Sequence, residues 1–407
     1  MIRTVWRVIL ALCVVSVACT PPTDAPGSTS ASPTASGTDG EADQATGTVT
    51  PTGPAPLLIG AVMADSGLAR RLDRPALAAA QVQVDAINAT GGIDGRPVEL
   101  RAVDTQTELN ATYNGALDLA DDGAVALLVT CDYDFAGPAL QVAADYGIPA
   151  VSPCGSDPRW ETSGAWSAGI STQAEGRAIA EVVAGRGVST VAVVVDSSAP
   201  EMVAQCEAFT ARFAALGGSV GGEFAYDREL IARFEPDILG PEPDLTPVGV
   251  GEQIVLCGSL PTTGPAVLAL LREREFTAPV IAGSAMDGTD WLTEDLGDVS
   301  FLSWGSTFRN DPVDAVDALV EAVRATIGGS AEGGTMVAGA DVMVALLRAV
   351  ERNPRDPAAE FPAMAGEDLV IATASWSTSD RMLDDRPLRV MRVDGDEAVV
   401  SEIVTAP

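Results

Sequence analysis

The side chains able to carry chemistry are unevenly represented in this chain. Its 407 residues include no histidine, the 24 basic residues are all arginine, and aspartate and glutamate together number 57. Without histidine there is no Ser-His triad, no histidine-ligated zinc and no histidine proton switch. Paired carboxylates keep a hydrolase open as an alternative to a protein that only binds its ligand. We expect no catalytic residue, no metal site and no cofactor.

Six cysteines form the second reactive set. Cys13 lies in an N-terminal apolar run, Cys19 follows that run, and the remaining four are Cys131, Cys154, Cys206 and Cys257. In an exported protein four thiols allow three disulfide pairings, and spacing does not choose among them. Buried free cysteines are the alternative.

The N-terminus has the layout of a bacterial export signal, with a basic start and an apolar run over 8–17 that is too short for a permanent membrane span. Cys19 directly follows Ala18, as in a lipobox, although Ser16 stands where leucine or valine is usual. We expect residues 1–18 to be a signal peptide and Cys19 to carry a lipid anchor in the cell membrane. A freely secreted protein is the alternative.

Residues 19–56 are expected to be the lipidated cysteine followed by a disordered linker. The stretch consists mostly of Thr, Pro, Ser, Gly, Ala and Asp, so it buries too little apolar surface to fold. The net charge of the chain is −33. Phosphate backbones and anionic lipid surfaces repel such a protein, which excludes nucleic acid as a partner.

Apolar periodicity divides the rest of the chain into alternating strands and helices. The first series opens with an apolar run over 57–63 and a helical face that starts at Pro75 and stops at Gly91-Gly92. Its other predicted elements are strands at 98–103, 125–129 and 148–151 and helices at 112–122 and 138–146. Such alternation predicts a parallel sheet with helices on both faces.

A second alternating series follows and predicts a second doubly wound lobe of the α/β class. Its predicted elements are helices at 173–184, 200–216 and 264–275, strands at 190–195, 253–256 and 279–282, two later helices at 313–327 and 336–350, and closing strands at 369–376, 388–393 and 398–404. Four prolines prevent an assignment between Asp227 and Gly251. A folded part of about 350 residues exceeds what one core usually organises, which also favours two lobes.

With these elements placed, the sequence resembles the type 1 periplasmic binding proteins, specifically the leucine/isoleucine/valine-binding group that serves ABC importers. The most specific match is DAINATGGIDGRPVEL at 85–100, followed by DTQ at 104–106. YGIPAVSP at 146–153 and GADV at 339–342 also match in order and spacing. The resemblance implies a small-molecule solute and a membrane ABC permease as partners. A ligand sensor of the same fold, signalling through a partner receptor, is the alternative.

The resemblance also implies two lobes joined by a three-segment hinge. We expect lobe 1 at 57–170 plus 303–352 and lobe 2 at 171–302 plus 353–407, with crossings near Ser171, Ser303 and Arg352.

Ligands in such open sheets lie beyond the carboxyl ends of the strands. In the first lobe these positions select candidate ligand-binding residues, some of which correspond to the family's carboxylate-binding positions: Ser66, Tyr133, Asp134, Cys154, Gly155 and Ser156. Tyr133 replaces the family's serine, which argues against a branched-chain amino acid. Asp134 also has a purely structural interpretation as a helix N-cap.

In the second lobe the same correspondence selects Glu201, Ser259 and Asp287. Asp134, Glu201 and Asp287 suit a ligand with positive charge, such as an amino acid or amide. Glu201 as a first-turn acid and Asp287 as a turn residue are the structural alternatives.

The fold implied by the resemblance selects one disulfide pattern. Cys131 and Cys154 follow neighbouring strands of lobe 1, and Cys206 lies on a helix beside the strand that ends at Cys257. We expect the disulfides Cys131–Cys154 and Cys206–Cys257, each within one lobe.

Overall fold

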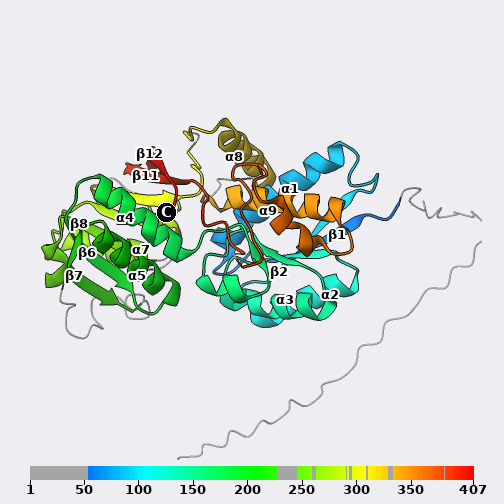
Figure 1. Cartoon of the computed structure of the whole chain (residues 1–407), viewed down its shortest axis with the longest axis horizontal. Coiled ribbons are helices and arrows are strands. Elements are labelled where there is room, and N and C mark those ends of the chain that lie inside the picture. Colours follow the sequence, from blue (N-terminus) through cyan, green and yellow to red (C-terminus); the bar gives the residue numbers. More distant parts are fainter. Residues whose placement is uncertain are drawn as a thin grey trace, which may run out of the picture. The chain divides into compact units, whose positions relative to one another are not determined.

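The computed structural model describes residues 54–227, 245–258, 263–289, 291–292, 296–308, 310–328, 333–379 and 381–407, which form two α/β lobes (Figure 1). Each lobe is built on one sheet. The prediction of two doubly wound lobes is confirmed.

The first sheet is entirely parallel and has the strand order β2-β1-β3-β4-β5. Its strands are β1 (Leu57–Met63), β2 (Val98–Asp104), β3 (Ala126–Val129), β4 (Ala150–Ser152) and β5 (Trp166–Ser167). All residues of β1 and β3 are buried, as expected for strands covered on both faces.

Helices cover both faces of this sheet (Figure 1). They are α1 (Arg70–Ala89) and α9 (Thr335–Arg352) on one face and α2 (Leu109–Asp121) and α3 (Tyr133–Tyr146) on the other. Helix α8 (Asp314–Ile327) packs on α1 and α9. Side chains of β1 alternate between the faces: Ile59 and Met63 share a core with α1 and α9, whereas Leu58 and Val62 share one with α2 and α3. The two-residue period of one strand therefore fixes the helices on both sides.

The second sheet has the order β12-β11-β10-β9-β8-β6-β7 and is parallel from β7 to β10. Its strands are β6 (Thr190–Asp196), β7 (Ser219–Tyr226), β8 (Gln253–Cys257), β9 (Val280–Ala282), β10 (Val299–Ser303), β11 (Leu388–Asp394) and β12 (Glu397–Val404). The hairpin of β11 and β12 adds an antiparallel edge.

Among the described residues, the second sheet is flanked by α4 (Thr172–Gly185), α5 (Pro200–Ala215) and α7 (Gly264–Glu273). Val193 and Val195 of β6 face α4 and α5, and Val194 faces the core that contains α7. Gly176 lets α4 approach α5 closely, because a Cβ there would lie 2.2 Å from the carbonyl oxygen of Gln205.

The chain passes between the sheets three times: from β5 to α4, from β10 to α8 and from α9 to β11. In the first and third connections, Ser171 donates from its backbone N–H and its hydroxyl to Asp384, at 2.7 and 2.8 Å. Arg386 donates to the carbonyl of Ala168 and forms a buried ion pair with Asp341 at 2.8 Å. The domain boundaries expected from the sequence remain a prediction.

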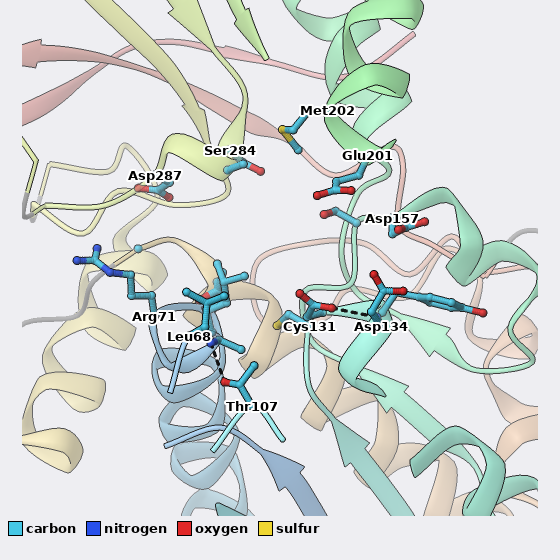
Figure 2. Close-up of a pocket in the computed structure, with 18 of the residues that line it drawn as sticks. Leu68, Arg71, Thr107, Cys131, Asp134, Asp157, Glu201, Met202, Ser284 and Asp287 are labelled. Carbon is cyan, nitrogen blue, oxygen red and sulfur yellow. Dashed lines mark hydrogen bonds between the residues drawn. The ribbon is translucent and has the colours of Figure 1, made fainter. Parts of the chain in front are cut away.

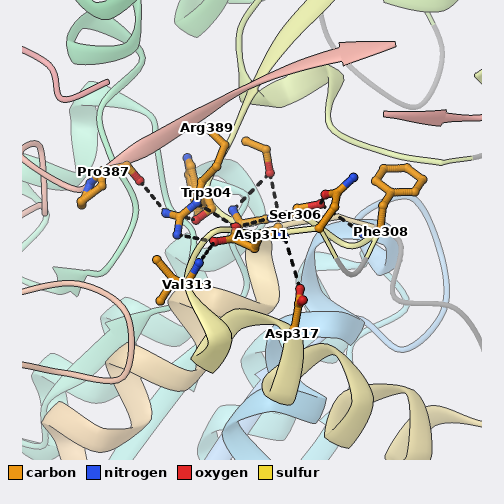
Figure 3. A network of polar contacts seen from close by, with 12 residues as sticks. Trp304, Ser306, Phe308, Asp311, Val313, Asp317, Pro387 and Arg389 are labelled. Carbon is orange, nitrogen blue, oxygen red and sulfur yellow. Dashed lines mark hydrogen bonds and ion pairs between the residues drawn. The ribbon is translucent and has the colours of Figure 1, made fainter. Parts of the chain in front are cut away.

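A second buried ion pair links the second connection to β11, the strand that follows the third connection (Figure 3). Arg389 of β11 donates to both carboxylate oxygens of Asp311, at 2.8 and 3.0 Å, and to the carbonyl of Trp304. Asp311 also accepts the backbone N–H groups of Ser306 and Val313, both at 3.0 Å. One carboxylate thus holds the whole turn between β10 and α8.

Several predicted element bounds are wrong. Helix α1 starts five residues before Pro75, α3 starts at Tyr133 rather than at 138, and β5, β7 and β10 were not predicted. Residues 369–376 do not form a strand of either sheet. Among the described residues no helix is long and apolar enough to cross a membrane.

The backbone at 369–376 has another partner in place of a strand. Asp341 of α9 accepts the N–H groups of Val370 and Ile371, both at 2.8 Å, and that of Ala372 at 3.4 Å. A side-chain carboxylate thereby satisfies donors that a sheet would otherwise satisfy.

Candidate ligand-binding site

A pocket of about 180 Å³ lies where loops after strands of both sheets meet (Figure 2). The first lobe contributes the segments that follow β1, β2, β3 and β4, including the starts of α1 and α3, and the start of α9. The second lobe contributes the start of α5 and η3 (Ser284–Met286). Its lining is Leu68, Ala69, Arg71, Leu72, Thr107, Cys131, Asp132, Tyr133, Asp134, Ser156, Asp157, Arg159, Glu201, Met202, Ser284, Ala285, Asp287, Gly333, Gly334 and Thr335.

Asp132 caps the N-terminus of α3 at this pocket. Its carboxylate accepts the backbone N–H groups of Asp134 at 2.9 Å and Phe135 at 3.4 Å. Burial raises the pKa of Asp132 above its ordinary value, although these hydrogen bonds favour the ionised form. The start of α3 therefore presents a carboxylate to the pocket.

Arg159 is enclosed by acidic and aromatic groups. Its guanidinium donates to Asp134 at 2.6 Å and to Asp157 at 2.5 Å, and lies 4.4 Å from the ring centroid of Tyr133. The Tyr133 ring packs edge-on against buried Trp160 at 5.4 Å. Hydrogen bonds from Arg159 to the two carboxylates raise its pKa further. Two aspartates and one arginine thus form a closed ion-pair group at the rim.

Asp287 joins the two lobes at the opposite side of the pocket. Its carboxylate accepts the hydroxyl of Ser303 at 2.7 Å and the backbone N–H of Gly334, next to α9, at 2.8 Å. Burial raises the pKa of Asp287 to about 6, whereas these hydrogen bonds act in the opposite direction. The side chain is ionised at neutral pH and loses its charge in mild acid.

Glu175 of α4 supports the pocket from beneath Ser284. The buried carboxylate accepts the backbone N–H of Ser284 at 3.1 Å, the amide of Gln205 at 3.0 Å and the indole N–H of Trp304 at 3.2 Å, together with the Ser284 hydroxyl. Burial raises the pKa of Glu175 to about 6. The network fixes η3, which carries Ser284 into the pocket.

Comparison with known sequences identifies the family. A sequence profile described as "Periplasmic binding protein" matches residues 56–398. The chain belongs to this family of binding proteins. It is therefore a binding protein and not an enzyme, and the family resemblance inferred from the sequence is confirmed. No curated protein matches the chain.

Solved structures share the fold of this binding protein. A putative branched-chain amino acid ABC transporter protein from Rhodospirillum rubrum is 21% identical, with a TM-score of 0.65, over 85% of this chain and 99% of that one. The substrate-binding protein LivJ from Streptococcus pneumoniae, in complex with isoleucine, is 16% identical, with a TM-score of 0.68, over 86% and 100%. A Rhodopseudomonas palustris solute-binding protein in complex with benzoate is 14% identical, with a TM-score of 0.65, over 86% and 98%.

Both predicted disulfides of the binding protein are confirmed. Cys131–Cys154 joins the ends of β3 and β4 with a Cα–Cα distance of 4.8 Å, and Cys206–Cys257 joins α5 to β8 at 5.9 Å. Beside the first, buried Asp73 accepts the backbone N–H groups of Ala64 and Cys131. Asp73 and these two sulfurs have the proximity of metal ligands, but a disulfide leaves no thiolate to bind an ion.

The structure brings together five of the candidate ligand-binding residues and separates others from them. Those that line the pocket are Tyr133, Asp134, Ser156, Glu201 and Asp287. Ser66, Cys154 and Gly155 are not in its lining: Ser66 donates to Asp104 at 2.7 Å, Cys154 is in the disulfide, and Gly155 lies against Trp160. Ser259 and Cys19 lie outside the described residues.

Sequence reasoning missed Asp132, Arg159 and Glu175. The N-cap of α3 is Asp132 and not Asp134, because the helix begins five residues earlier than predicted. An aspartate three residues after the predicted strand at 125–129 was the available signal. Arg159 pairs with nearby Asp157, but its contact with Asp134 is distant in sequence. The hydrogen bonds of the Glu175 carboxylate are all to residues distant in sequence, so no local pattern indicates its role.

Proposed function

We propose that this protein captures a small polar solute with positive charge, amino acid- or amide-like, and delivers it to an ABC permease. The observation that carries the proposal is the pocket between the lobes, where the described lining residues include five carboxylates and two guanidinium groups. One guanidinium, that of Arg159, is already paired with two of those carboxylates. The remaining acidic groups favour a cation over an anion.

Three features support a transport role outside the cytoplasm. The family is that of periplasmic binding proteins, similar folds come from proteins described as ABC transporter components, and the pocket is lined from both lobes. A ligand that contacts both lobes stabilises their closed arrangement, and a permease can recognise that closed form. A sensor that signals through a receptor would use the same closure, and deletion of a neighbouring permease gene separates the two roles through loss of solute uptake.

We also propose that residues 1–18 are removed as a signal peptide and that Cys19 is lipidated. Replacing Cys19 by serine in the full chain tests this, because the variant is expected to move from the membrane fraction to the soluble fraction of a bacterial host. Retention of the Cys19→Ser variant at the membrane contradicts lipid anchoring. Replacement of Cys13, inside the apolar run, is the matched control and is expected to leave the protein membrane-bound.

A thermal-shift screen of the purified full chain tests the binding function. A ligand that binds only the folded state raises Tm, by mass action, as its concentration rises above Kd. We expect a shift from amino acids, amides or amines and none from sugars or dicarboxylates. Absence of any shift, together with absence of a copurified solute by mass spectrometry, contradicts the function.

A further inference from the structure

The N-terminus of α3 is already occupied by a carboxylate of the protein. A helix N-terminus attracts anions because its first N–H groups are unpaired and its dipole is positive there. Asp132 accepts two of those N–H groups and directs its own negative charge toward the pocket. A ligand carboxylate at this position would meet fewer free donors and a like charge.

The two arginines of the lining do not offset this charge beside α3. Arg159 is bound by Asp134 and Asp157, so its guanidinium is neutralised before a ligand arrives. Arg71 lies on the Asp287 side, and its guanidinium points away from Cys131 and Asp134 (Figure 2). The region around the start of α3 is therefore suited to a cationic group.

Apolar residues in the rest of the lining favour a ligand with a small apolar body. Leu68, Leu72, Met202 and Ala285 face the same pocket. Its volume of about 180 Å³ is slightly larger than the roughly 150 Å³ cavity that accepts benzene in an engineered protein. A pocket of this size leaves no room for a peptide or an oligosaccharide.

We propose that the ligand is a small organic cation, an aliphatic amine or guanidine, with an apolar body and no carboxylate. The inference rests on the proposed function and narrows its solute class. It sets this pocket apart from the benzoate- and isoleucine-bound proteins of similar fold, since both of those ligands carry a carboxylate.

Calorimetry of the purified full chain with matched pairs tests the proposal. Each pair is an amine and the amino acid that adds only a carboxylate: isoamylamine and leucine, cadaverine and lysine, agmatine and arginine. We expect the tightest-binding amine to exceed its amino acid by at least about tenfold in affinity.

The outcomes distinguish this inference from the function on which it rests. An amino acid that binds as tightly as its amine overturns the inference and leaves the proposed function standing. A neutral or anionic solute that binds while all amines fail overturns both the inference and the positive charge of the proposed solute. Failure of every solute in these pairs and in the thermal screen overturns both.

The Asp132→Asn variant separates the effect of the negative charge at Asp132 from its role as the N-cap of α3. Asparagine caps helices as well as aspartate does, so the variant keeps the cap and loses only the negative charge. We expect a roughly 10- to 100-fold loss of amine affinity and a smaller preference for amine over amino acid. Asp145→Asn, on the exposed end of the same helix, is the matched control and should bind as the parent does. Unchanged amine affinity in a folded Asp132→Asn protein contradicts the assignment.

Discussion

Asp287 faces the pocket while it accepts hydrogen bonds from Ser303 and Gly334. Its pKa of about 6 implies that the group becomes neutral as pH falls from 7 to 5. A cationic ligand then loses part of its attraction, so we expect affinity to fall by about tenfold over that range. Asp287→Asn should bind more weakly at pH 7 and show a flatter pH profile. A parent affinity independent of pH between 5 and 7 contradicts this role.

Individual site residues were predictable only where the fold places strand ends. Tyr133, Ser156 and Glu201 follow strands or begin helices, so their approximate position follows from the alternation of elements. Predicting Asp132 as the N-cap would have required the exact first residue of α3, and helix starts are the least certain feature of a sequence-based prediction. Predicting the role of Glu175 would have required the tertiary structure, because it depends on the packing of α4 beneath η3.

The elements were predicted best where one strong period governs a segment. Strand β1 and helix α9 match their apolar patterns closely. Strand β7 was missed because it lies at the sheet edge, has Tyr226 as its single buried residue and contains Gly221-Gly222, which are poor strand formers. The apolar, β-branched run at 369–376 has the composition of a strand, but Asp341 takes three of its backbone donors.

The connections between the lobes depend on two buried ion pairs, and we expect Arg389→Met to expose that dependence. The substitution leaves Asp311, which is 6% exposed, as a buried carboxylate without its cation, at a cost of about 3–5 kcal/mol in the free energy of unfolding. In the double variant Arg389→Met/Asp311→Leu the buried charge is gone, so a double-mutant cycle by urea unfolding should give a coupling of about 2 kcal/mol.

An exposed ion pair provides the control for that cycle. Arg101 and Asp122 are 2.6 Å apart, with side chains 41% and 62% exposed, and solvent screening leaves such pairs with at most about 1 kcal/mol. A coupling at Arg389–Asp311 no larger than at Arg101–Asp122 contradicts a structural role for the buried pair.

At the scale of the molecule, three buried carboxyl groups of the described residues make stability depend on pH in an unusual direction. Burial raises the pKa of Asp73, Glu175 and Asp287 to about 6, against ordinary values of 3.8, 4.5 and 3.8. Between about pH 4 and pH 6 the folded state therefore binds more protons than the unfolded state, and the free energy of unfolding falls as pH rises. Each group contributes on the order of 2–3 kcal/mol at most.

The net charge of −33 acts in the same direction, because protonation relieves repulsion in the folded state. The Arg352–Glu367 pair opposes it only in stronger acid, since the pKa of Glu367 is lowered. We thus expect Tm by calorimetry to be several degrees higher at pH 5 than at pH 7.5. Asp73→Asn removes one titrating group and should flatten this slope, whereas Asp145→Asn should not. A Tm that rises from pH 5 to pH 7.5 in the parent means that surface ion pairs, and not the buried carboxyl groups, govern its stability.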